Sequence, residues 1–98
     1  MMQGEIPAGL LARDLLIVNK KGLHARAAAK FVQCADRFDA EVTVSKDSTT
    51  VGGTSIMGLM MLAAGIGSSI RVTADGPEAE AALAAIASLV ADRFGEEE

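Results

Sequence analysis

The spacing of apolar residues switches along the chain between the two-residue period of a strand and the longer period of an amphipathic helix. Residues 40–46 alternate, with Val42 and Val44 on one side and polar residues on the other. Residues 25–38 instead gather their apolar side chains on one helical face, opposite Arg26, Lys30, Gln33 and Arg37. This switching restricts the chain to a fold that mixes α and β elements.

The same combination of period and turn signals predicts the remaining elements. Asp47-Ser48 supplies a tight turn for a hairpin, and Ser55 is expected to cap a short helix. The predicted order is β-α-β-β-α-β-α, an α+β fold in which an antiparallel sheet has helices on one face and water on the other. These elements are expected at 15–18, 25–38, 40–46, 49–51, 56–62, 70–74 and 79–94.

The length of 98 residues fits one domain. Half of the residues are hydrophobic and 22% are charged, which is typical of a globular protein. Residues 1–12 have no clear period and are interpreted as a loose N-terminal extension. Residues 13–94 are expected to form the domain, and residues 95–98 are interpreted as a solvated acidic tail.

Charge, cysteine content and apolar runs argue against several classes of protein. The formal net charge of −4 gives no attraction to nucleic acid or to an anionic membrane. Cys34 is the only cysteine, which rules out an intramolecular disulfide and suits a reducing compartment; it is expected to be a packing residue. No signal peptide or membrane-spanning run is recognised. The sequence therefore predicts a cytoplasmic protein that neither binds nucleic acid nor inserts into a membrane.

His24 is the only histidine and stands immediately before the first expected helix. The unpaired N–H groups of Ala25, Arg26 and Ala27, together with the helix dipole, favour an anion at that position. The planar guanidinium of Arg26 suits phosphate oxygens, and neutral imidazole is a nucleophile. These residues predict a phosphorylated imidazole held at the start of the helix, although a histidine in this place is more often an ordinary surface residue or cap.

A metal site is not expected, because His24 has no second histidine and Cys34 lies ten residues away. No cofactor is expected either.

The segment Gly22-Leu23-His24-Ala25-Arg26 resembles the active-centre motif of HPr, the histidine-containing phosphocarrier family of the phosphoenolpyruvate-dependent phosphotransferase system. A second block at residues 54–60, Thr-Ser-Ile-Met-Gly-Leu-Met, resembles the regulatory serine motif of that family. The resemblance covers residues 13–94. It implies an open-faced β-sandwich in which a four-stranded antiparallel sheet carries three helices on one face. It also implies a phosphocarrier that is not an enzyme.

The resemblance further implies roles for single residues. His24 matches the histidine that is phosphorylated on Nδ1, and Arg26 matches the arginine that steadies the phosphate. Ser55 matches a serine that a dedicated kinase modifies in many bacteria, which makes a serine kinase/phosphorylase a possible partner. The family commonly has proline where this chain has Ala27, and alanine retains an N–H donor in the first turn.

Partner docking is implied in the same way. Ile56, Met57 and Met60 match exposed apolar positions that bind enzyme I and enzyme IIA domains. A seven-residue helix over 56–62 cannot bury all of its apolar side chains, and flexible methionine suits a surface that meets several partners. A carrier that presents one site to several partners is expected to be a monomer. The pathway, sugar uptake or nitrogen-linked regulation, is left open.

Three other classes of protein are compared with the phosphocarrier. An RNA-binding sheet stacks bases on aromatic residues of its strands, but Phe31, Phe38 and Phe94 all fall on expected helices. A small-molecule regulatory domain is not distinguished by pattern alone, and ligand-dependent thermal stabilisation is its test. A serine hydrolase is disfavoured, because the chain has one histidine and no Gly-x-Ser-x-Gly motif.

Overall fold

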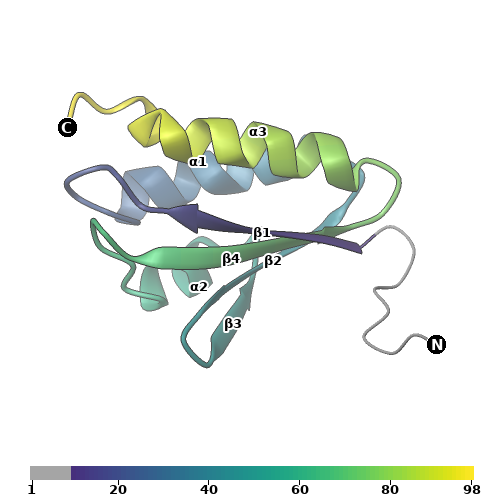
Figure 1. Ribbon diagram of the computed structural model, residues 1–98, viewed down its shortest axis with the longest axis horizontal. Coiled ribbons are helices and arrows are strands. Elements are labelled where there is room, and N and C mark those ends of the chain that lie inside the picture. The colour runs from purple at the N-terminus through teal and green to yellow at the C-terminus, as the bar shows by residue number, and fades with distance from the viewer. Residues whose placement is uncertain (1–9) are drawn as a thin grey trace.

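Four antiparallel strands form one sheet in the order β1-β4-β2-β3 in the computed structural model, which describes residues 10–98 (Figure 1). The predicted order of elements and the four-stranded antiparallel sheet with three helices are confirmed. The elements are β1 (Leu10–Leu16), α1 (Ala25–Ala35), β2 (Glu41–Lys46), β3 (Thr49–Gly52), α2 (Ile56–Met61), β4 (Ser69–Asp75), α3 (Ala79–Ala91) and a 3-10 turn at Arg93–Gly95.

The two central strands explain why one face of the sheet is buried. In β4 the alternate residues Ile70, Val72 and Ala74 are buried, and in β2 Val42 and Val44 are buried, whereas the residues between them are exposed or half-buried. The two strands pair with their apolar residues in register. The period of two therefore sends one continuous aliphatic surface toward the helices and leaves the other face polar.

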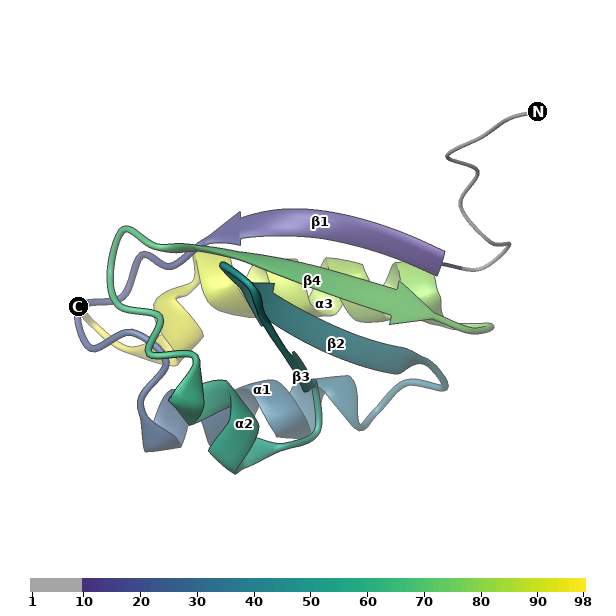
Figure 2. The same cartoon turned by 90° about the horizontal axis from the view of Figure 1, so that it is seen from below.

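The helices bury this surface. Figure 1 shows α1 and α3 lying together over one face of the sheet, and Figure 2 shows α2 beside α1. Phe31 of α1, Leu59 of α2 and Ile86 of α3 are fully buried in one core cluster with the sheet residues. Within residues 10–98, no helix has both the length and the apolar character needed to cross a membrane.

Cys34 lies in this core on α1, as expected for a packing residue. Burial raises the pKa of its thiol, and the nearby charge of Arg37 opposes that shift only in part. The thiol therefore stays protonated at neutral pH, which is the unreactive form of cysteine.

The ends of several elements differ from the sequence-based expectation. β1 covers Leu10–Leu16 rather than the expected residues 15–18, because it pairs with β4 along its whole length although its side chains do not alternate in burial. The expected extension is therefore wrong for residues 10–12, and its residues 1–9 lie outside the described residues. α1 ends at Ala35 because the N–H groups of Arg37 and Phe38 bond three residues back in tighter turns, which leaves Phe38 half-buried.

Candidate functional site

His24 is the N-cap residue of α1, with an extended backbone whose φ is −75° and ψ is −179°. Its carbonyl oxygen accepts the first helical hydrogen bond, from the N–H of Ala28 at 2.8 Å. Within the described residues, the N–H groups of Ala25, Arg26 and Ala27 make no backbone hydrogen bond. The imidazole is therefore attached where three free donors and the positive end of an eleven-residue helix meet.

A tight turn fixes this loop in front of the helix. Gly22 has a φ of 67°, in the left-handed region that favours glycine. The following N–H, of Leu23, donates to the carbonyl of Ala64 at 2.9 Å. The side chain of Leu23 is buried as well. Leu23, the residue just before His24, therefore anchors the loop both through its backbone N–H and through its side chain in the core.

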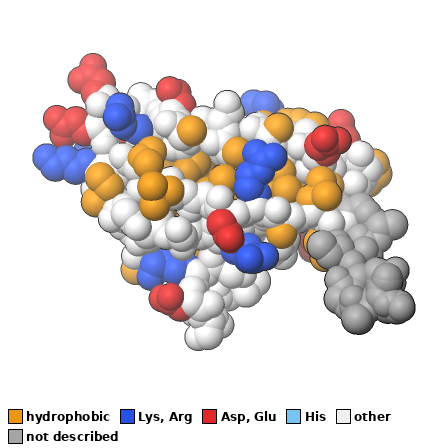
Figure 3. Space-filling view, viewed as in Figure 1, with side chains coloured by type: hydrophobic (Ala, Val, Ile, Leu, Met, Phe, Trp, Pro, Cys, Tyr) orange, Lys and Arg blue, Asp and Glu red, His pale blue; other side chains and the backbone are white. Residues whose placement is uncertain are grey.

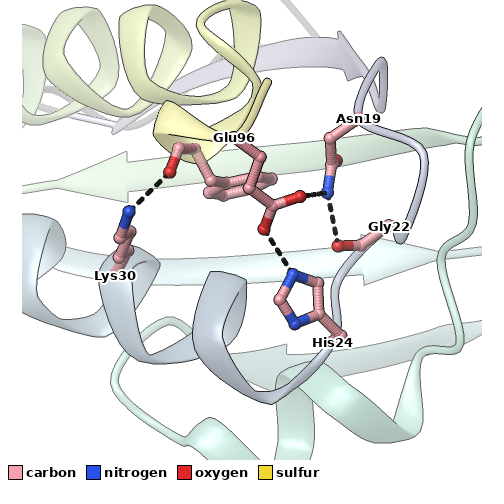
Figure 4. Close-up of polar contacts among 6 residues, drawn as sticks. Asn19, Gly22, His24, Lys30 and Glu96 are labelled. Carbon is pink, nitrogen blue, oxygen red and sulfur yellow. Dashed lines mark hydrogen bonds and ion pairs between the residues drawn. The ribbon is translucent and has the colours of Figure 1, made fainter. Parts of the chain in front are cut away.

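The ring of His24 is neither buried in the core nor fully exposed, because 29% of the side chain is accessible. Its Nε2 contacts a carboxylate oxygen of Glu96 (Figure 4). Among residues 10–98, no group forms a hydrogen bond with the other ring nitrogen, Nδ1. The arrangement thus occupies one nitrogen and leaves the second free to react.

Arg26 is exposed, and its guanidinium forms no ion pair with another described residue. It lines a depression at the start of α1 together with Lys20, Lys21 and His24. Charged side chains of both signs gather at this end of the molecule, beside the C-terminus (Figure 3). Lys20 pairs with Glu98 at 3.5 Å, but the guanidinium of Arg26 and the ammonium of Lys21 lie beside the imidazole and suit a phosphate group. Ala27 faces the other way and is buried in the core.

Glu96 is the residue of this site that the sequence analysis missed, and the expected solvated tail at residues 95–98 is wrong in this respect. Only 19% of the Glu96 side chain is exposed. One carboxylate oxygen contacts His24, and the other accepts a hydrogen bond from Nδ2 of Asn19 at 3.0 Å. Desolvation opposes ionisation, but these hydrogen bonds outweigh it and lower the pKa of the Glu96 carboxyl. The group is therefore a carboxylate at neutral pH.

The backbone just before Glu96 directs it toward the site. Arg93, Phe94 and Gly95 all have left-handed φ values, of 58°, 55° and 79°, which turn the chain sharply after α3. Phe94 is fully buried, and its carbonyl accepts a hydrogen bond from Nζ of Lys30 at 2.8 Å. The apolar anchor and this bond to α1 compensate for the unfavourable backbone angles.

The serine-containing block forms the start of α2, and the predicted cap is confirmed. The hydroxyl oxygen of Ser55 accepts a hydrogen bond from the N–H of Gly58 at 3.0 Å. Ile56, Met57 and Met60 are exposed, with relative accessibilities of 42%, 69% and 41%, and neighbouring Met61 is exposed as well. These four residues are called the α2 patch below.

The loop after α2 joins this block to His24. Ala64 accepts the hydrogen bond from Leu23, and residues 63–65 line a small depression with Lys21 and His24. The loop that follows the second block is thus a direct neighbour of His24. Within residues 10–98, no group of three or more His, Cys, Asp or Glu side chains is placed to hold a metal ion.

Comparisons with known proteins agree with this arrangement. The family model described as the PTS HPr component phosphorylation site matches residues 11–92. The phosphocarrier protein HPr of Cupriavidus necator is 51% identical over 89 residues, which are 91% of this chain and all of that protein. The phosphocarrier protein NPr of Shewanella violacea is 44% identical over 86 residues, covering 88% of this chain and 94% of that protein.

Solved structures agree as well. The crystal structure of HPr-C-His from Thermoanaerobacter tengcongensis has a TM-score of 0.86 and 41% identity, and the match covers 90% of this chain and 99% of that one. The likeness thus extends over nearly the whole length of the proteins compared. The chain belongs to the HPr family, whose members are phosphocarriers of the phosphotransferase system rather than enzymes.

Proposed function

We propose that this phosphocarrier accepts a phosphoryl group from phosphorylated enzyme I on Nδ1 of His24 and passes it to an enzyme IIA domain. The observation that carries the proposal is the Nδ1 at the N-terminus of α1, which has no partner among residues 10–98 and lies beside three amides and a guanidinium that are likewise unpaired within that range. The cytoplasm is the compartment in which we expect this exchange, and a monomer is the form we expect.

The transfer is a substitution at phosphorus. The lone pair of Nδ1 forms the new N–P bond while the bond between phosphorus and the donor breaks, and the electron pair of that bond stays on the donor. The same step runs in the other direction when the acceptor attacks phospho-His24. The amides of residues 25–27 and the side chain of Arg26 are the groups that stabilise the phosphate oxygens in both states.

The test follows the phosphate through the chain of proteins. Incubation with phosphoenolpyruvate and enzyme I is expected to label the protein once, and ³¹P and ¹⁵N NMR are expected to locate the label on Nδ1 of His24. Addition of unphosphorylated enzyme IIA domains should then remove it. A label on any other residue, or a label that no enzyme IIA domain accepts, contradicts the proposal. Comparing sugar-type with nitrogen-type enzyme IIA domains as acceptors assigns the pathway. Both types are included because the relatives of this chain include proteins named HPr and NPr.

Arg26→Ala is expected to slow phosphoryl transfer roughly ten- to a hundredfold, because a hydrogen bond from a charged group to phosphate contributes about 1.5–3 kcal/mol. The side chain is exposed, so the fold should be unaffected. Rapid-quench measurement of transfer from phosphorylated enzyme I checks the rate. Arg26→Lys keeps the charge but loses the planar pair of guanidinium donors, so an intermediate rate is expected. An unchanged rate in Arg26→Ala would exclude the assigned role.

Ser55 is the proposed regulatory phosphosite. Its hydroxyl is at the start of α2, next to Ile56 and Met57 of the α2 patch, so a phosphate there adds negative charge beside an apolar docking surface. Because negative charge at a helix N-terminus is tolerated, the helix should survive, and the effect should fall on binding of the partner.

Ser55→Asp is therefore expected to raise several-fold the KM of enzyme I for this protein as its substrate. The maximal rate of His24 phosphorylation should stay near that of the parent. Ser55→Asn is the matched control, since both side chains cap a helix well and only aspartate brings charge. Thermal unfolding of the two variants should agree within a few degrees. Equal KM values for the two variants would show that charge at this position does not control docking.

A further inference from the structure

We propose that Glu96 is a positioning residue for His24, whose carboxylate holds the ring proton on Nε2 and so leaves the lone pair of the neutral ring on Nδ1. The inference rests on the proposed function and deepens it, because it says why one ring nitrogen rather than the other receives the phosphoryl group. An ionised carboxylate only accepts hydrogen bonds, so the Nε2 that contacts it must be the donor.

The second carboxylate oxygen of Glu96 is held by Asn19. Nδ2 of the buried residue Asn19 donates to Glu96 at 3.0 Å and to the carbonyl of Gly22 at 2.8 Å (Figure 4). Two acceptors face this one amide nitrogen, which fixes the orientation of the Asn19 side chain. The same amide therefore binds both the carboxylate and the turn that carries His24, and it links their positions.

The chain on both sides of Glu96 is also held. Phe94 is buried on one side, and on the other the N–H of Lys20 donates to the carbonyl of Glu98 at 2.5 Å. Figures 1 and 2 both show the C-terminal segment beside the loop between β1 and α1. Because the segment that carries Glu96 is already fixed, its carboxylate loses little conformational entropy when it bonds to the ring of His24 and restricts the orientation of that ring.

The contact has a consequence for both directions of transfer. When Nδ1 carries the phosphoryl group and Nε2 its proton, the ring is a cation, and the carboxylate of Glu96 stabilises that charge. On onward transfer the N–P bond breaks, its electron pair returns to Nδ1, and the proton remains on Nε2. The leaving group is then a neutral imidazole, which needs no further proton.

Glu96→Ala is the test, with the ring tautomer as its first measurement. In the parent, ¹⁵N chemical shifts and long-range ¹H–¹⁵N couplings at a pH where the ring is neutral should show the proton on Nε2. In Glu96→Ala they should move toward a mixture of the two tautomers. Transfer from phosphorylated enzyme I should slow roughly tenfold or more, as is typical when a group that orients a reactive histidine is removed.

Glu97→Ala is the matched control. It removes the same charge one residue later, and the Glu97 side chain is exposed and pairs with no other described residue. This variant should retain the tautomer and the transfer rate of the parent. The proposal is overturned if Glu96→Ala keeps the parent tautomer, or if the parent holds its proton on Nδ1. Mapping of the phosphate to another residue in the parent would instead overturn the proposed function and leave the tautomer result standing.

Discussion

His24→Ala is expected to abolish phosphorylation by phosphoenolpyruvate and enzyme I, with no label above background. His24 is the only histidine in the chain, and alanine offers no nucleophile at the N-terminus of α1. The free amides and Arg26 would still attract phosphate, but without a covalent bond the group could not be carried between proteins. Gel-shift or mass measurement of the reaction mixture checks the result.

The loss should not come from unfolding. Among residues 10–98, the His24 side chain makes one polar contact, to Glu96, and the ring lies outside the core cluster. The far-UV circular dichroism and thermal midpoint of the variant should therefore be close to those of the parent. Labelling that persists in a folded His24→Ala protein would refute the phosphoacceptor assignment outright.

Gly22→Ala is expected to cause the largest loss of stability of the variants considered. Gly22 has a φ of 67°, and a Cβ atom there would lie 2.4 Å from the carbonyl oxygen of Ala64 and 2.8 Å from Cα of Gly65. Both are backbone atoms and cannot rotate away. The left-handed conformation costs about 1–2 kcal/mol and an overpacked contact a further 1–3 kcal/mol, so the total is roughly 2–5 kcal/mol.

A loss of that size lowers the thermal midpoint by about 10 °C or more in a chain of this length. Gly65→Ala is the matched control on the other side of the same contact, because a Cβ atom there would have no heavy atom within 4 Å and its φ is not in the left-handed region. Calorimetry of the two variants should separate them clearly. Similar midpoints for both would mean that the close approach at Gly22 does not limit stability.

Local patterns in the sequence were sufficient for the order of the elements. Strands and helices differ in apolar period, so Val42 and Val44 could be assigned to a buried strand face without knowledge of their partners. β1 was predicted less well, since its position depends on pairing with β4 rather than on alternation of its own side chains. The end of α1 was placed too late because Phe38 continues the apolar pattern past the last helical turn.

The central residues of the candidate site could also be predicted from the sequence, because they too depend on local patterns. His24 and Arg26 lie within one helical turn of each other, and the free amides between them follow from where the helix begins. The cap at Ser55 is equally local, because its hydrogen bond spans only three residues. Each of these features is determined by residues that are neighbours in the chain.

The sequence by itself therefore determined the helix that begins just after the reactive histidine, and the cation beside that histidine. Only the tertiary structure decided which ring nitrogen is free. Glu96 is 72 residues away from His24 and belongs to a run of glutamates with no pattern of its own. It reaches the ring because Phe94 is buried and three left-handed residues turn the chain. Such a contact depends on how α3 packs across the sheet, which no local period encodes.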